Sequence, residues 1–452
     1  MLDSGDVARY LFLAILALSA RAVAQPEHVV LISIDGLAAY ELDDDDVELP
    51  NLRELIKNGV RAESSETIFP SVTHPSHTTL VTGVVPKVHG VIGNRLVNRE
   101  TGERFHITNK THPESVRVPT IFDAAKSKGL VTAAFYWPES RDDPALDFNI
   151  PEVFNGNAAD PGAADPAFLD ELRQADVPID LYYRWYPDRF RIGAADAILA
   201  DAAAYVIRKY RPHLLAIHFV ATDEIQHAYG SEHYRSKEAL TIADHAVGIL
   251  RKAIDDARLT DETAFFIVAD HGFHTVRHEV NVHPVFERHG LTDRVRLHRS
   301  GWLLYVELVD VAREEPALES VFDDVLELEG IARILRPTDY DALGYPRYEQ
   351  DPHVRGQYAI VGDIDTFLVT DASSASTARH ERAEPYHGHG YLPSHPRMYP
   401  AFIASGVGIR KGIRVGHVRN LDVAPTVAYL LGLELPSAAG VVMEEVLADV
   451  ER

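Results

Sequence analysis

The stretch HVVLISIDG, residues 28–36, decides how the rest of the chain is interpreted. Its first seven residues are nearly all apolar and β-branched, which is typical of a parallel strand buried on both faces. The strand ends at Asp35 and Gly36, and the pattern then changes to that of a helix. Similar buried-strand runs recur at 130–136, 214–221, 264–269 and 401–404, and helical patterns lie at 52–58, 194–208, 237–258 and 422–431. This alternation predicts an α/β fold with a mostly parallel central sheet flanked by helices.

Two stretches interrupt the alternation. Residues 155–191 are rich in Pro, Ala, Asp and Tyr, and we expect an irregular excursion over the sheet there. Residues 277–386 form a longer mixed insertion with a strand-like run at 302–306. We expect both stretches at one end of the sheet, where they shape a pocket. We then expect the insertion to form a cap within a single domain that spans residues 25–452.

Composition narrows the function classes. The chain has 452 residues, of which 46% are apolar and 25% charged, the profile of a globular protein with a sizeable core. It carries 44 Lys and Arg against 68 Asp and Glu, a net charge of −24, which argues against coating a nucleic acid. A small phosphate ester remains compatible with this charge, because bound metal ions reverse the local field. The absence of cysteine excludes disulfides, thiolate metal sites and a cysteine nucleophile.

The N-terminal residues 1–24 resemble a secretory signal peptide. Arg9 precedes an apolar run at 10–18, and Ala22-Val23-Ala24 forms a small-residue cleavage site before Gln25. The run is too short to span a membrane, and no later segment reaches 18 apolar residues. The sequence therefore predicts a secreted or periplasmic protein with no integral membrane segment. The alternative is an amphipathic N-terminal helix.

Carboxylates follow three of the predicted strands. Asp35, Asp223 and the pair Asp270-His271 each come after a buried run. Ligands of parallel sheets lie beyond the carboxyl ends of the strands, so these side chains converge on one edge. Asp223 and His227 are one helical turn apart and could bind the same ion. Each element alone is more often a cap or a turn residue, but together they predict a metal site with the oxygen and nitrogen ligands of zinc or manganese.

A second motif is FPSVTHPSHTTLVTG, residues 69–83. Pro75 suits the first turn of a helix and Gly83 suits its end, so we expect Thr73 just before the helix N-terminus, where anions are favoured. A hydroxyl that binds a metal there can ionise and act as a nucleophile. The alternative role for Thr73 is that of a simple helix cap.

Two further segments carry polar groups that suit such a site. Asn94 lies in a glycine-lined turn and could donate to a phosphoryl oxygen without adding charge, although a plain turn residue is the alternative. The segment YHGHGYLP, residues 386–393, follows the insertion and offers a histidine that could return to the metal cluster.

The ordered set of these residues resembles the nucleotide pyrophosphatase/phosphodiesterase family of the alkaline phosphatase superfamily, from about residue 28 to 435. The resemblance implies an alkaline-phosphatase-like fold and two Zn²⁺ ions per chain, with Mn²⁺ or another divalent metal as an alternative. It implies that one ion binds Asp35, Thr73, Asp270 and His271, and that the other binds Asp223, His227 and His389. It also implies that Thr73 is the nucleophile of a covalent intermediate and that Asn94 holds a non-bridging oxygen.

The motif around the nucleophile departs from the family pattern. Family nucleotide hydrolases usually carry Lys-Thr-Phe-Pro-Asn-His, whereas this chain has Val-Thr-His-Pro-Ser-His at 72–77. His74 replaces the aromatic residue that stacks on a base, so nucleotides, lipid headgroups and other small diesters all remain candidate substrates. A phosphonate hydrolase on the same scaffold also stays open.

A phosphomonoesterase is the nearest rival. The threonine-type monoesterases carry a Lys-x-Arg pair after the nucleophile, and none occurs between Asn94 and Ala200, so we favour a diesterase. A non-catalytic binding module is disfavoured because every ligand position holds a competent residue. The sequence indicates no oligomeric state.

Overall fold

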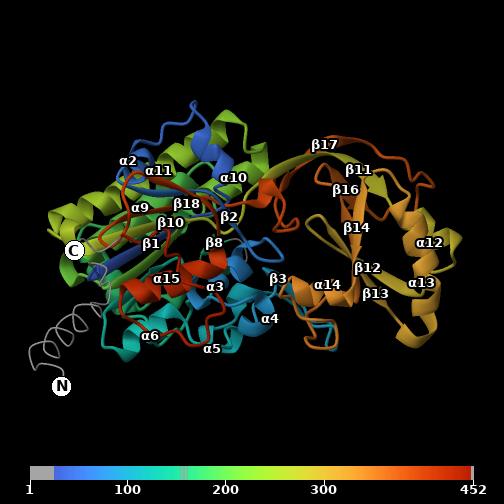
Figure 1. Cartoon of the computed structure of the whole chain (residues 1–452), viewed down its shortest axis with the longest axis horizontal. Coiled ribbons are helices and arrows are strands. Elements are labelled where there is room, and N and C mark those ends of the chain that lie inside the picture. The colour runs from blue at the N-terminus through green and yellow to red at the C-terminus, as the bar shows by residue number, and fades with distance from the viewer. Residues whose placement is uncertain (1–24, 153, 156–157, 160, 449–452) are drawn as a thin grey trace, which may run out of the picture.

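The computed structural model describes residues 25–448 except 153, 156–157 and 160. Figure 1 shows a central sheet covered by helices, with a smaller lobe beside it that is coloured yellow to orange. The predicted signal peptide, residues 1–24, lies outside the described residues. In the described part of the chain, no helix is long and apolar enough to cross a membrane.

The central sheet has eight strands and is mostly parallel, as the sequence predicts. Only β18 runs antiparallel to its neighbours β10 and β2. Ile32 of β1 lies opposite Ile217 of β9 and Ile267 of β10, so the three longest buried runs form the middle of the sheet. The strand order is β19 (Ile413–Arg419), β2 (Gly59–Glu66), β18 (Phe402–Gly406), β10 (Thr263–Val268), β1 (His28–Ile34), β9 (Leu214–Phe219), β5 (Thr132–Phe135) and β6 (Phe148–Ile150).

Both faces of this sheet are buried, which explains why its central strands are apolar throughout. Successive side chains of a strand point to opposite faces. Val30 and Ile32 therefore pack in one apolar cluster with α2 (Pro50–Lys57), α9 (Ile192–Tyr210), α10 (Ala221–Tyr229) and α11 (Tyr234–Asp256). Val29 and Leu31 pack in another with α3 (Thr73–Thr82), α6 (Ile121–Ser127) and α15 (Val423–Leu430). Figure 1 shows these two helical layers on either side of the sheet.

The expectation of an irregular excursion at 155–191 is wrong for part of that segment. It contains α7 (Pro166–Gln174) and α8 (Ile179–Trp185), and these helices bury Leu172 and Tyr182 in the main core. The side chain of Asp165 caps α7 by accepting a hydrogen bond of 2.8 Å from the Ala167 N–H. Asp165 and Pro166 start a helix here, whereas the abundance of proline and aspartate in residues 155–191 suggested a loop.

Residues 277–386 fold largely into the separate lobe, as expected for a cap-like insertion. Its antiparallel sheet has the order β12 (Val295–Ser300), β13 (Leu303–Leu308), β15 (Tyr358–Gly362) and β14 (Ile331–Leu335). The helices α12 (His283–Arg288), α13 (Val311–Leu326) and α14 (Pro337–Ala342) accompany it. A three-stranded sheet of β16 (Thr366–Val369), β11 (His274–Asn281) and β17 (His380–Gly388) joins the lobe to the rest of the chain. The predicted strand at 302–306 corresponds to β13.

Several further short elements lie outside the central sheet. They are α4 (Pro86–His89), β3 (Arg95–Val97), β4 (Arg104–His106), α5 (His112–Ser115), β7 (Phe154–Asn155) and β8 (Ala158–Ala159). Trp302 of the insertion shares an apolar cluster with Phe69 and Val91, which lie on either side of α3 in the sequence. The lobe is therefore packed against the segment that carries Thr73.

Candidate active site

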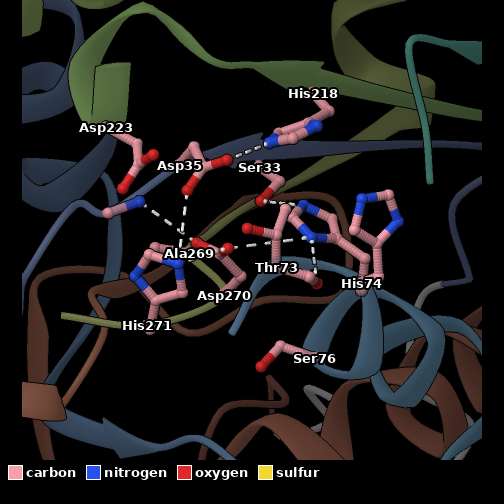
Figure 2. Close-up of polar contacts among 12 residues, drawn as sticks. Ser33, Asp35, Thr73, His74, Ser76, His218, Asp223, Ala269, Asp270 and His271 are labelled. Atoms are coloured by element: carbon pink, nitrogen blue, oxygen red, sulfur yellow. Dashed lines mark hydrogen bonds and ion pairs between the residues drawn. The ribbon is translucent and has the colours of Figure 1, made fainter. Parts of the chain in front are cut away.

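Three carboxylates meet at the carboxyl edge of the central sheet. Asp35 follows β1 directly, Asp270 comes two residues after β10, and Asp223 lies in the first turn of α10 after β9. Because β1, β9 and β10 are adjacent and parallel, their carboxyl ends lie together. Figure 2 shows these carboxylates gathered around the imidazole of His271. The Gly36 N–H donates to Asp270 Oδ1 over 3.1 Å, which fixes that carboxylate against the end of β1.

Histidines complete this cluster. His271 Nε2 lies 3.0 Å from Asp270 Oδ2 and 3.5 Å from Asp35 Oδ1. His389 stacks on His271, with ring centroids 3.5 Å apart, and its Nε2 lies 3.7 Å from Asp223 Oδ1. His227 Nε2 lies 3.4 Å from Asp223 Oδ2. The structure therefore brings together all six Asp and His residues that the sequence analysis proposed as metal ligands.

The hydrogen bonds of these histidines favour one tautomer. The Nδ1–H of His271 donates to the Gly272 carbonyl over 3.0 Å, and that of His227 donates to the His387 carbonyl over 2.9 Å. His389 donates in the same way to the Ser71 carbonyl over 3.0 Å. Each Nε2 then keeps its lone pair and faces the carboxylates. Metal-binding histidines are typically held in this way by a backbone acceptor.

The centre of the cluster fits a cation. Four buried atoms there have no hydrogen-bond partner among the described residues, namely Asp35 Oδ1, Asp223 Oδ1, Asp270 Oδ2 and His271 Nε2. Burial raises the pKa of Asp35 well above its usual range, and the charges of Asp270 and Asp223 raise it further. A divalent ion would satisfy these atoms and allow every carboxylate to stay ionised.

Within this cluster, two groups of the described residues are compact enough to share an ion. One is Asp35, Asp270 and His271, and the other is Asp223, His271 and His389. The second group includes His271 where the family resemblance implies His227. His227 nevertheless lies near the other oxygen of the Asp223 carboxylate, Oδ2, at the distance given above.

Thr73 lies beside this cluster at the start of α3. Val72 occupies the N-cap position, so Thr73 is not the cap residue of this helix. Asn94 Nδ2 donates to Thr73 Oγ1 over 3.3 Å, while its Oδ1 accepts from the His74 N–H over 3.1 Å. Asn94 is thus more than a turn residue, because its amide connects the hydroxyl to the helix N-terminus. Gly83 ends the helix in the left-handed conformation, with φ of 67°.

His218 supports the cluster from behind, and the sequence analysis missed it. Its Nε2–H donates to Asp35 Oδ2 over 3.0 Å, and its ring is fully buried on β9. In the sheet register His218 lies opposite Ser33 of β1, whose hydroxyl is 2.8 Å from His77 Nε2. A polar residue within the apolar run LLAIHF was the available signal.

His74 occupies a different environment from the one that the motif suggested. Its Nδ1 lies 2.7 Å from Glu139 and its Nε2 lies 3.7 Å from Glu152, and only 2% of the residue is exposed. Burial lowers the pKa of His74, but Glu139 and Glu152 outweigh this effect and raise it to about 9. Burial raises the pKa of Glu152 to about 7. The imidazole is therefore bound to two carboxylates and is not available to stack on a base.

One large cavity opens in front of the cluster. Its volume is about 1060 Å³, and Asp35, Thr73 and Asn94 line its inner end. Residues of the insertion, among them Tyr305 and Arg355, line the same cavity. Ligand pockets typically measure about 300–1,000 Å³, so a molecule of nucleotide size fits here.

Comparison with known proteins agrees with this geometry. The pattern that defines the type I phosphodiesterase / nucleotide pyrophosphatase family matches residues 29–392. Rat ectonucleotide pyrophosphatase/phosphodiesterase family member 7 is 26% identical over 427 residues, which cover 90% of this chain and 84% of that protein. Mouse family member 3 is 26% identical over 246 residues, which cover 54% of this chain and 24% of that protein. The chain thus matches about a quarter of the length of that relative.

A solved structure shows the same fold. Murine ectonucleotide pyrophosphatase/phosphodiesterase 5, determined as an inactive variant in complex with AMP, has a TM-score of 0.68 to this chain at 17% identity. The match covers 93% of this chain and all of that one. On the match of the defining pattern over most of its length, the chain belongs to the type I phosphodiesterase / nucleotide pyrophosphatase family.

Proposed function

We propose that this protein hydrolyses phosphodiester or phosphoanhydride bonds of small substrates through a covalent intermediate on Thr73. One observation carries the proposal: buried carboxylates and imidazole Nε2 atoms converge at the sheet edge, beside a threonine hydroxyl at a helix N-terminus. Family membership supports the same chemistry.

The ligand cluster is proposed to hold two divalent ions. Asp35, Asp270 and His271, together with the Thr73 hydroxyl, would hold one ion. Asp223, His227 and His389 would hold the other. Oxygen and nitrogen donors of this kind suit Zn²⁺, with Mn²⁺ as the alternative. Bound there, such ions would lower the pKa of the attacking hydroxyl or water and offset the charge of the phosphoryl oxygens.

The residues of the chain then perform the reaction in two steps. Thr73 Oγ loses its proton to solvent and attacks the phosphorus, while the bond from phosphorus to the leaving oxygen breaks and that oxygen takes up a proton from solvent. Water next attacks the phosphothreonine, the bond from phosphorus to Thr73 Oγ breaks, and one proton of the water restores the threonine hydroxyl as the phosphoryl product leaves. Asn94 Nδ2 is positioned near Thr73 Oγ1 to donate to a non-bridging oxygen in both steps. This donor is neutral, which suits the single charge of a diester.

Steady-state kinetics on the zinc-loaded protein test the proposal. The substrates are bis-p-nitrophenyl phosphate, p-nitrophenyl phosphate and the p-nitrophenyl ester of thymidine 5′-monophosphate. We expect the diesters to exceed the monoester in kcat/KM, and Thr73→Ala to lose more than about a thousandfold in kcat while it retains its zinc. A lead for the monoester would identify a phosphatase instead. Full activity of Thr73→Ala would exclude the covalent route.

We also propose that residues 277–386 act as a cap within one catalytic domain of residues 25–452, because the insertion lines the cavity that contains Thr73. Secretion or export to the periplasm is proposed from the signal-like pattern at 1–24. Recovery of an exported protein whose first residue is Gln25 would support this, whereas retention of residues 1–24 would contradict it.

A further inference from the structure

The cavity collects arginine side chains as well as carboxylates. Arg95, Arg189, Arg299 and Arg355 all line it. Arg189 is paired with Glu224, at a separation of 2.7 Å between Nη2 and Oε1. Within the described residues, the other three guanidinium groups have no carboxylate at ion-pair distance. Unpaired arginines are unexpected in a chain with 68 acidic and 44 basic residues, so this wall of the cavity is suited to an anion from outside.

Two of these arginines lie near the candidate active site. Arg95 is close to it in the sequence, and Arg299 is close to it in space. Arg95 directly follows Asn94 and begins β3. Arg299 lies near the end of β12, just before the turn at Gly301. A Cβ atom on Gly301 would lie 3.1 Å from the carbonyl oxygen of His389, so this turn approaches the metal-ligand cluster closely. Gly301 has a φ of 57°, which also favours glycine there.

Arg355 joins these two segments. Its Nη2 donates to the Arg95 carbonyl over 2.8 Å, and its Nη1 donates to the Arg299 carbonyl over 3.1 Å. One guanidinium therefore bridges the segment after Asn94 and the β12 strand of the insertion. A guanidinium has five N–H donors, so Arg355 retains donors for a ligand after these two bonds.

Arg299 is held in place by an aromatic ring. Its guanidinium carbon lies 4.4 Å from the centroid of the Phe367 ring. This contact limits the motion of the side chain without neutralising its charge. Arg299 and Arg355 are thus partly ordered before a ligand arrives, which lowers the entropy cost of binding.

We propose that Arg95, Arg299 and Arg355 form an anion subsite for a second phosphate group of the substrate, separate from the phosphate that Thr73 attacks. The substrate class is then a phosphoanhydride or diester that carries an additional phosphate. Guanidinium groups bind phosphate oxygens through paired N–H bonds, which makes arginine the appropriate residue. The location of the attacked phosphate rests on the proposed function.

Equilibrium binding to the zinc-loaded Thr73→Ala protein tests this subsite without turnover. Calorimetric titrations at low ionic strength compare AMP with ADP, which adds one phosphate. We expect ADP to bind at least about tenfold more tightly, because charge-assisted hydrogen bonds are the strong ones. Adding Arg299→Gln or Arg355→Gln is expected to weaken ADP binding by roughly tenfold while AMP binding changes less than about threefold.

Arg189→Gln is the matched control, since Arg189 lines the same cavity but is paired with Glu224. It should leave the ratio of the two affinities unchanged. Arg355→Gln also removes two bonds to the backbone, so Arg95→Gln and Arg299→Gln decide the outcome if that variant does not fold. These two guanidinium groups make no hydrogen bond within the described residues.

Equal affinities of the zinc-loaded Thr73→Ala protein for AMP and ADP would overturn the subsite. An equal loss of affinity for both ligands in the arginine variants, or no binding of either ligand, would overturn it as well. Turnover of bis-p-nitrophenyl phosphate by the zinc-loaded protein with Thr73 intact is measured in parallel. Turnover without an ADP preference would overturn the subsite and retain the proposed function. An ADP preference without turnover would retain the subsite and overturn the proposed function.

Discussion

Substitution of Asn94 separates its two roles at the active site. Its Nδ2 donates to Thr73 Oγ1, and its Oδ1 accepts from the His74 N–H. Asn94→Ala removes both contacts. Asn94→Asp keeps an acceptor for the His74 N–H but replaces the donor by a charged oxygen. The two variants should therefore rank in opposite order for stability and for activity.

The structure sets the size of each effect. Removal of one donor aimed at a developing oxyanion costs about 10²–10³ in kcat, or about 2.7–4 kcal/mol, and we expect this loss for Asn94→Ala. That variant also leaves the His74 N–H without its partner, which should lower the free energy of unfolding by about 1 kcal/mol. Asn94→Asp should keep the unfolding free energy near wild type, because a negative charge at the N-terminus of α3 is favourable by about 0.3–1 kcal/mol. Its charge repels a phosphate anion, so its kcat/KM should fall below that of Asn94→Ala.

The assay combines two measurements on each zinc-loaded variant. Hydrolysis of bis-p-nitrophenyl phosphate gives kcat and KM, and urea unfolding gives the stability. An Asn94→Asp protein as active as Asn94→Ala would show that the amide does not face the substrate phosphate. An Asn94→Ala protein within tenfold of wild type would refute the assignment of Asn94 as an oxyanion donor.

Other predictions follow from the buried charges. Chelation should lower the melting temperature, because zinc at about 100 times its Kd stabilises the folded state by about 2.7 kcal/mol. Equal melting temperatures with chelator and with zinc would contradict the metal site. Burial raises the pKa of Asp196 from 3.8 to about 8. Between about pH 4 and 8 the folded state therefore binds a proton that the unfolded chain releases. Because of this, Asp196 makes the free energy of unfolding fall as the pH rises through that range. Asp196→Asn should flatten that dependence in denaturant unfolding at pH 5, 7 and 8, and parallel curves for both proteins would count against it. His74→Phe should destabilise the fold by about 3–5 kcal/mol in urea, because Glu139 and Glu152 lose their buried partner, and it should not create a preference for the nucleotide diester. An unchanged unfolding midpoint would show that this network is not stabilising.

The parts of the site that follow strand ends could be predicted from the sequence. Asp35 and Asp270 each follow an apolar run, and the rule that parallel strands end at one edge is enough to place them together. Asp223 and His227 needed only the spacing of one helical turn. These predictions succeed because each depends on a local pattern and on one general property of parallel sheets.

Contacts between distant segments could not be predicted in this way. Glu139 and Glu152 are 65 and 78 residues from His74 in the chain, and no local pattern joins them to it. The bond from Arg355 to the Arg95 carbonyl spans 260 residues and depends on how the insertion packs. The helices within 155–191 were missed for a different reason, because a capping aspartate and an N-terminal proline also occur in loops.

The charge distribution of the cavity explains how an acidic protein can bind an anionic substrate. The net charge of −24 repels phosphate at a distance, and the carboxylates of Asp35 and Asp223, which line the cavity, repel it most strongly there. Cations bound to those carboxylates reverse the local field there. If Arg95, Arg299 and Arg355 attract a second phosphate, the bound cations and the arginines each receive one anionic group. Such a substrate would be oriented before the reaction. Without bound metal, only Arg95, Arg299 and Arg355 would attract it.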